Sequence, residues 1–208
     1  MMNGLILKDW LYLRKAFLIL GGASVIIAGF LVPLGIGCVS YLIMAFFAIL
    51  MPLNAMTMDT TSRFDRYALA LPRTRREIVA ARYQFGLLCF GAVATLCFAS
   101  ALLAEIFLPA GHADLLGISP LVWWIGIMGG ALLVFDVTLA VFYRYRMNIG
   151  VFAIIAVAIL PNLAVYAPYM MIQPMVGWIA AALAVAGLVG LPVSWRVSLA
   201  AYERWDVN

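Results

Sequence analysis

The residues of this chain that best suit a specific chemical role, ion pairing, are arginines gathered in one polar stretch. Residues 59–83 read DTTSRFDRYALALPRTRREIVAARY and form the only long polar interruption in an otherwise apolar sequence. Guanidinium groups pair with carboxylates and phosphates, so the stretch suits docking to an acidic protein surface or to anionic lipid. Its six arginines are Arg63, Arg66, Arg73, Arg75, Arg76 and Arg82.

The residue sets on which enzymes depend are missing from the sequence. A phosphate-cradling loop needs glycines followed by Lys-Ser or Lys-Thr, whereas the only two lysines precede Asp9 and Ala16. One histidine, His112, cannot form an HExxH zinc site, and no Ser-His-Asp set lies at a plausible depth. The three cysteines have no paired or metal-like spacing. We therefore expect no catalytic residue, no metal site and no cofactor in this chain.

The composition requires a membrane as the solvent for most of the chain. Of 208 residues, 67% are hydrophobic and 11% charged, with a mean hydropathy of +1.09, whereas soluble domains carry about 25% charged residues. Lipid offers no partner to open backbone groups, so the spans must be helices. The net charge of +4 comes from residues that flank apolar runs, which is a topology signal and not a nucleic-acid interface.

The apolar runs predict an all-α integral membrane protein with six transmembrane helices in a single domain, residues 1–208. The predicted spans cover residues 16–34, 39–58, 83–107, 121–143, 149–167 and 175–195. Up to the start of the first span, apolar residues recur at spacings of three and four, namely Ile6, Trp10, Leu13 and Phe17. This stripe, opposite charged side chains, predicts an amphipathic helix in the membrane interface.

The lysines and arginines indicate how the spans are oriented. All 13 lie before the first span, between the second and third, between the fourth and fifth, or after the sixth. Because cytoplasmic loops carry the excess of lysine and arginine, both termini and residues 59–83 are predicted on the cytoplasmic side of the cell's inner membrane.

Within the polar stretch, the pattern predicts a surface helix, a proline elbow and a rod. Pro72 ends the first helix, and Thr74 with Glu77 forms a capping box that starts a second helix leading into the third span. Topology alone needs only positive charge, so these features favour partner docking over lipid binding alone. The apolar face of the surface helix is formed by Phe64, Tyr67, Ala68 and Leu71.

Residues 71–83, LPRTRREIVAARY, resemble the Leu-Pro-x-Ser/Thr-Arg motif, followed by Ile-Val and a basic-Tyr pair, of ABC-2 type permeases. These are membrane subunits of ATP-binding-cassette exporters, and the likeness is to the six-span branch of bacterial peptide-export and bacteriocin-immunity systems. The N-terminal LILKDWLYLRK resembles the lead-in of the same branch. Arg82 stands where the motif has a lysine, and Arg73 where it has a smaller apolar residue.

The resemblance implies a subunit that works with partners. A second six-span copy or a paralogue would complete the pathway, and separate cytosolic ATPases would bind ATP and Mg²⁺. The cargo would be an amphipathic peptide or a lipid-like molecule. A coupling helix over residues 62–71 and an elbow over residues 72–77 would dock on the ATPase. The docking residues implied are Arg63, Phe64, Arg66, Tyr67, Leu71, Pro72, Arg75, Arg76 and Glu77.

Three residues of the fourth span are candidates for a role in the transport pathway or in helix packing. A carboxylate at the depth of Asp136 is costly, so we expect it to line a pathway, to contact a neighbouring helix, or to reach toward Arg144 or Arg146. Gly126 and Gly130 form a GxxxG pair that lets helices approach closely, either inside the subunit or between copies.

Two other functions fit parts of the sequence. An ion-coupled secondary transporter needs carboxylates near the middle of the membrane, for which only Asp136 is available. A non-transporting scaffold or sensor could recruit a cytosolic protein through the basic loop.

Overall fold

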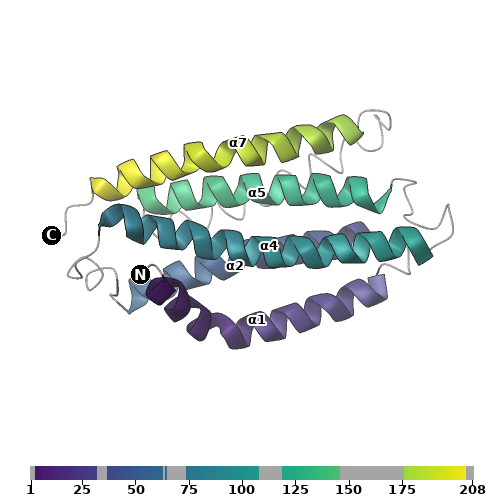
Figure 1. The fold of residues 1–208 in the computed structure, drawn as a ribbon, viewed down its shortest axis with the longest axis horizontal. Coiled ribbons are helices and arrows are strands. Elements are labelled where there is room, and N and C mark those ends of the chain that lie inside the picture. Colours follow the sequence, from purple (N-terminus) through teal and green to yellow (C-terminus); the bar gives the residue numbers. More distant parts are fainter. Residues whose placement is uncertain are drawn as a thin grey trace.

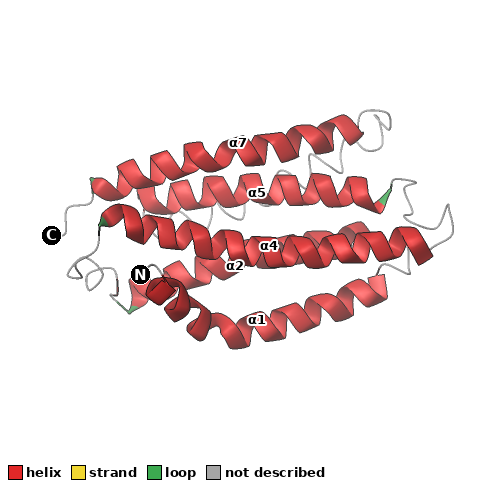
Figure 2. Ribbon diagram, in the orientation of Figure 1, coloured by secondary structure: helices red, strands yellow, loops and turns green. Residues whose placement is uncertain are grey.

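Helices make up the regular structure of the protein. The computed structural model describes residues 3–31, 37–62, 64, 74–107, 119–145 and 176–204, and within these ranges Figure 2 shows helices and no strand. The all-α prediction is therefore confirmed for the described part of the chain. The helices are α1 (Asn3–Leu31), α2 (Gly37–Thr61), α4 (Arg75–Phe107), α5 (Pro120–Tyr145) and α7 (Val176–Glu203).

The helices lie side by side in one elongated bundle (Figure 1). The beginnings of α1 and α4 and the ends of α2, α5 and α7 meet at one end of it, at the left of Figure 1, together with both termini. α5 packs most extensively on α7, whereas α2 contacts α1, α4 and α5. The most deeply buried large side chains, Tyr41, Val79, Phe135 and Leu139, come from α2, α4 and α5.

Four of the helices, α2, α4, α5 and α7, are long and apolar enough to cross a membrane. α1 is bent by 53° between its two halves, Gly4–Lys15 and Phe17–Leu31. If the two halves together count as one broken span, α1 adds a fifth candidate span. The bend falls where the sequence predicts the first span to begin, although an interfacial position for the first half stays a prediction. The predicted span over residues 149–167 lies outside the described residues, so the described part of the chain has four or five candidate spans, and six stays a prediction.

At the end where the termini lie, two helices continue past the apolar runs. α4 begins at Arg75, eight residues before the predicted span at 83–107, and α7 continues to Glu203, eight residues beyond 195. The length of an apolar run indicates only the part of a helix that lies in the hydrocarbon layer. A helix can continue beyond that layer into the polar interface, because its backbone groups remain hydrogen-bonded there.

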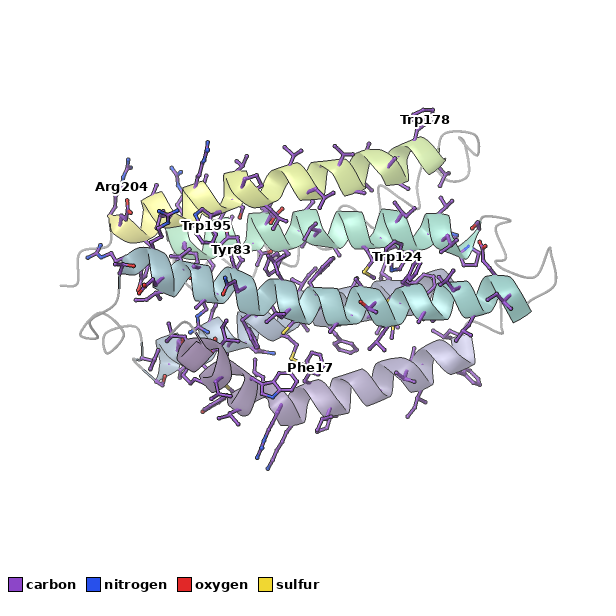
Figure 3. The ribbon with its side chains drawn as sticks, in the orientation of Figure 1. Phe17, Tyr83, Trp124, Trp178, Trp195 and Arg204 are labelled. Atoms are coloured by element: carbon purple, nitrogen blue, oxygen red, sulfur yellow. The ribbon has the colours of Figure 1, made fainter. Side chains whose placement is uncertain are left out.

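We call this end the basic end, because the described lysines and arginines all belong to helix segments in the half of the bundle nearest to it. The opposite end carries Glu105 and Trp178, and Trp178 projects outward from the start of α7 (Figure 3). The basic side chains are Lys8, Arg14, Lys15, Arg75, Arg76, Arg82, Arg144, Arg196 and Arg204.

Candidate functional site

Four charged side chains from three helices meet at the basic end, and we call them the charge cluster: Lys8 and Asp9 of α1, Asp59 of α2 and Arg82 of α4. The guanidinium of Arg82 pairs with both carboxylates, Asp9 and Asp59. Nζ of Lys8 lies 2.6 Å from Oδ1 of Asp59 and 3.3 Å from Oδ1 of Asp9. Two acids and two bases make the cluster electrically neutral.

Three members of the charge cluster are buried and the fourth, Lys8, is half-buried, which makes each pairing matter. Asp9, Asp59 and Arg82 are only 3%, 6% and 9% exposed. Charges taken out of water persist only when they are paired, and removing one partner from such a pair costs about 3–5 kcal/mol. Within the described ranges, no three His, Cys, Asp or Glu side chains gather as metal ligands would. The cluster is therefore suited to joining α1, α2 and α4, and its chemistry is ion pairing.

Phe64, the one residue of the predicted docking face that the structure describes, contacts Lys8 of the charge cluster. Nζ of Lys8 lies 3.6 Å from the centroid of its ring, a cation–π contact. Phe64, Asp9, Asp59 and Arg82 line a small cavity of about 30 Å³. The beginning of the arginine-rich stretch therefore contacts α1. Other predicted docking residues lie outside the described residues: Arg63, Arg66, Tyr67, Leu71 and Pro72.

The first turn of α4 is capped as the sequence predicts. The backbone N–H of Glu77 donates to Oγ1 of Thr74 at 3.3 Å, and the backbone N–H of Thr74 donates to Oε2 of Glu77 at 3.4 Å. This reciprocal pair satisfies two backbone donors that a helix start leaves open. The capping box is confirmed, and α4 begins one residue after Thr74.

Arg75 joins the start of α4 to the end of α7. Its Nη1 donates to the backbone carbonyl oxygens of Tyr202 at 3.1 Å and Glu203 at 2.5 Å. The last carbonyls of a helix lack partners within the helix and carry partial negative charge, so a guanidinium there is favourable. Arg76, the next residue, is exposed. Two adjacent arginines of the predicted docking set thus have different surroundings.

A directed chain of hydrogen bonds links α7, α4 and α5 just inside the charge cluster. Oγ of Ser194 donates to the backbone carbonyl of Asp136 at 2.6 Å. The single proton of Ser194 is then in use, so the hydroxyl of Tyr83, 2.5 Å away, must donate to it. Ser198, 2.8 Å from the same hydroxyl, donates to Tyr83 in turn. Figure 3 shows Tyr83 beside Trp195 of α7, with ring centroids 5.4 Å apart.

The side chain of Asp136 lies against α7. Asp136 is 3% exposed, and neither carboxylate oxygen has a hydrogen-bond partner among the residues that the structure describes. A Cβ added at Gly190 would come within 2.6 Å of Oδ2, so the absence of a side chain at Gly190 makes room for the carboxylate. Of the surroundings expected from the sequence, the structure gives Asp136 a neighbouring helix, and its role in transport stays a prediction.

Glycines allow the close approach of α5 and α7. A Cβ on Gly129 would lie 2.5 Å from the backbone nitrogen of Ala184, and one on Gly187 would lie 2.9 Å from the carbonyl oxygen of Gly129. Gly126 is less crowded, 3.3 Å from Cβ of Ala180. The contact therefore lies inside the chain. Its tightest point is Gly129, between the two glycines Gly126 and Gly130 that the GxxxG spacing indicates.

Sequence reasoning identified the arginine-rich stretch but missed the charge cluster and the Tyr83 chain. A signal for the cluster was present, because Lys8, Asp9, Asp59 and Arg82 are two acids and two bases beside apolar runs, where unpaired charge is costly. Among the arginines of the stretch, only Arg82 directly precedes an apolar run in the sequence, but its carboxylate partners, Asp9 and Asp59, cannot be identified from that position. No comparable signal marks Ser194 and Ser198.

Comparison with known proteins agrees with this architecture. A family model described as "ABC-2 family transporter protein" matches residues 4–203, which reach from α1 to the last residue of α7. No curated protein matches the chain, and no solved structure does.

Proposed function

The chain belongs to the ABC-2 family of transporter proteins, and from that premise we propose that it is the permease subunit of an exporter driven by a separate cytosolic ATPase. Membership, together with several apolar helices long enough to span, makes it a multi-pass membrane permease of an ABC transporter. The family implies an ABC ATPase as partner. The proposed cargo, an amphipathic peptide or lipid-like molecule, and the proposed second six-span copy come from the resemblance of residues 71–83 and the N-terminal lead-in.

We propose that the basic end faces the cytoplasm of the cell, across the inner membrane. The described lysines and arginines lie in the half of the bundle nearest that end, and cytoplasmic loops carry the excess of these residues. This orientation presents the arginine-rich stretch between α2 and α4 to the ATPase.

The observation that carries the coupling proposal is the ion pair between Asp59 and Arg82, the first charge and the last arginine of that stretch. This ion pair joins the end of α2 to the first turns of α4. A force applied to the coupling helix and elbow therefore moves the two helices together and does not separate α2 from α4. The same Arg82 also pairs with Asp9 of α1. Movement of the elbow is therefore passed to α1, α2 and α4 together.

Two further features suit this transmission. α4 runs without interruption from Arg75 to Phe107, 33 residues or about 50 Å at 1.5 Å per residue. Arg75 joins its first turn to α7, which packs on α5. In this mechanism a push at the elbow tilts α4 as a rod, and the clamps at its base carry α1, α2 and α7 with it.

The test is co-purification of the chain with an ABC ATPase encoded beside it, reconstitution, and measurement of transport-coupled ATP hydrolysis. Phe64→Ala alone is a poor probe, because Phe64 also contacts Lys8. Tyr67→Ala is the better one and should lower cargo-stimulated hydrolysis while leaving the amount of permease in the membrane unchanged. Unchanged coupling in Tyr67→Ala, in a complex that retains its ATPase, would remove the docking assignment.

A second candidate function rests on the buried carboxylate of Asp136, which an ion-coupled transporter would use. The discriminating measurement is transport into vesicles at constant ATP while the ion gradient is collapsed. Continued transport supports the ATP-driven permease, and loss of transport supports ion coupling.

A further inference from the structure

An open groove lies between the ends of α5 and α7 at the basic end, away from the charge cluster. It encloses about 410 Å³ and is lined by Arg144 of α5 and by Val197, Ala200, Ala201 and Arg204 of α7. The four α7 residues are spaced i, i+3, i+4 and i+7, so they form one face of that helix. The small side chains form an apolar floor, and Arg204 projects from the end of α7 (Figure 3).

The apolar floor continues along α7 away from the basic end. Val189, Val193 and Val197 follow one another at intervals of four residues and are 60%, 57% and 38% exposed. These valines share a helix face with Ala200 and Arg204. A track of exposed apolar side chains therefore leads to a groove with a guanidinium on each helix.

The depth of these residues matches the layers of a membrane. The candidate spans run over Pro120–Arg144 and Val176–Glu203, so both arginines lie where these helices end. Val189 and Val193 lie inside the apolar run that ends near residue 195, and Val197 lies just past it. Apolar side chains at that depth contact acyl chains, and arginines at the end of a span meet phosphates of the lipid headgroups.

From this geometry we infer that the groove binds one anionic phospholipid of the surrounding membrane, with its phosphate between Arg144 and Arg204 and an acyl chain along the valine track. Guanidinium groups bind phosphate through paired, charge-assisted hydrogen bonds. A soluble anion has no acyl chain, so it would gain no binding energy from the valine track. An acidic protein segment in the cytosol could not reach the valine track. The inference is independent of the proposed coupling to an ATPase.

Native mass spectrometry of the detergent-purified chain tests the inference directly. Titration with dioleoyl-phosphatidylglycerol should give one tightly bound lipid, and dioleoyl-phosphatidylcholine should bind more weakly. Arg144→Gln/Arg204→Gln should weaken the first phosphatidylglycerol site about 30-fold, the factor expected for two arginines near an anionic headgroup. Equal binding of the two lipids, or an unchanged affinity in the double variant, would overturn the proposal.

Two matched variants separate a built site from general charge. Arg14→Gln/Lys15→Gln removes the same net charge from exposed positions on α1 and should leave the first site intact. Ala200→Trp keeps every charge but fills the groove at an exposed position, and it should abolish the site. A loss in the α1 pair as large as in the groove pair would show that charge alone attracts the lipid, and full binding in Ala200→Trp would show that the groove is not used.

The same experiment distinguishes other occupants of the groove. Inorganic phosphate at millimolar concentration should not displace phosphatidylglycerol, and displacement would identify a phosphate site without the lipid. A dimer that forms without lipid and is broken by Ala200→Trp would assign the groove to a second copy of the chain. Either result would overturn the lipid assignment.

Discussion

The carboxylate of Asp59 pairs with the guanidinium of Arg82, and these two residues lie at opposite ends of the arginine-rich stretch. The pair makes α2 and α4 neighbours at the point where the chain leaves one and enters the other. Because Arg82 also pairs with Asp9, the N-terminal half of α1 is held at the same point. The segment proposed to contact an ATPase, residues 62–77, thus lies between two residues that are joined in one neutral, largely buried group of charges.

Loss of Arg82 should destabilise the protein strongly. Arg82→Gln leaves Lys8 facing two carboxylates, so the buried charge cluster gains a net charge of −1, and the free energy of unfolding should fall by about 3–5 kcal/mol. The measurement is reversible unfolding in mixed micelles, with Arg76→Gln as the matched exposed control, which should change it by less than about 0.5 kcal/mol.

A second substitution tests whether charge balance is the cause. Arg82→Gln/Asp9→Asn restores neutrality, because Lys8 and Asp59 remain as a pair. The double variant should therefore be more stable than Arg82→Gln alone. Additive destabilisation would show that the residues contribute by packing and not by mutual pairing.

Arg75 should hold the last turn of α7 in place. Arg75→Gln removes a cation from the carbonyls of Tyr202 and Glu203, a loss of about 1 kcal/mol. Amide hydrogen exchange in the last turn of α7 should then become about fivefold faster, the factor that corresponds to about 1 kcal/mol, while exchange in the middle of α5 stays the same. Arg76→Gln again serves as the control, and equal acceleration in both variants would contradict the clamp.

The features predicted correctly from the sequence are those that depend on neighbours in the chain. The capping box of Thr74 and Glu77 lies within four residues, and the long apolar helices α2, α4, α5 and α7, which are candidate spans, follow from continuous apolar runs. Local hydrogen bonding and hydropathy decide these features, and both can be read directly from a single sequence.

The features that were missed depend on how distant segments pack. Arg82 and Asp9 are 73 residues apart, and Tyr83 and Ser194 are 111 residues apart. A GxxxG spacing identifies the small-residue face of α5 but not which glycine meets the partner helix, since that depends on where α7 crosses. The crossing point places Gly129 against Ala184 and Gly187.

Of the glycines of α5, Gly129 should be the one whose substitution lowers the stability of the protein most. Gly129→Ala would set a Cβ 2.5 Å from a backbone nitrogen of α7, where no side chain can move aside, and should cost about 1–3 kcal/mol of stability. Gly91→Ala on α4 is the control, because nothing lies within 4 Å of its added Cβ. It should be neutral or slightly stabilising, since alanine favours helix more than glycine does. Thermal unfolding in detergent separates the two, and similar midpoints would contradict the close packing.

Asp136 offers the sharpest test of whether a buried carboxylate serves transport or packing alone. Asp136→Asn keeps the shape of the side chain and its place against Gly190 but removes the ionisable group. If the carboxylate takes part in transport, export by the reconstituted complex should fall several-fold, while the amount of folded protein stays the same and its free energy of unfolding stays within about 1 kcal/mol of the wild type. Thr138→Val is the matched control, because Thr138 is also buried on α5 and its hydroxyl likewise has no hydrogen-bond partner among the described residues. Replacing that hydroxyl by a methyl group of the same shape should leave both stability and export nearly unchanged. Wild-type export by Asp136→Asn would assign the residue to packing against α7, and an equal loss in Thr138→Val would show that this part of α5 tolerates no substitution.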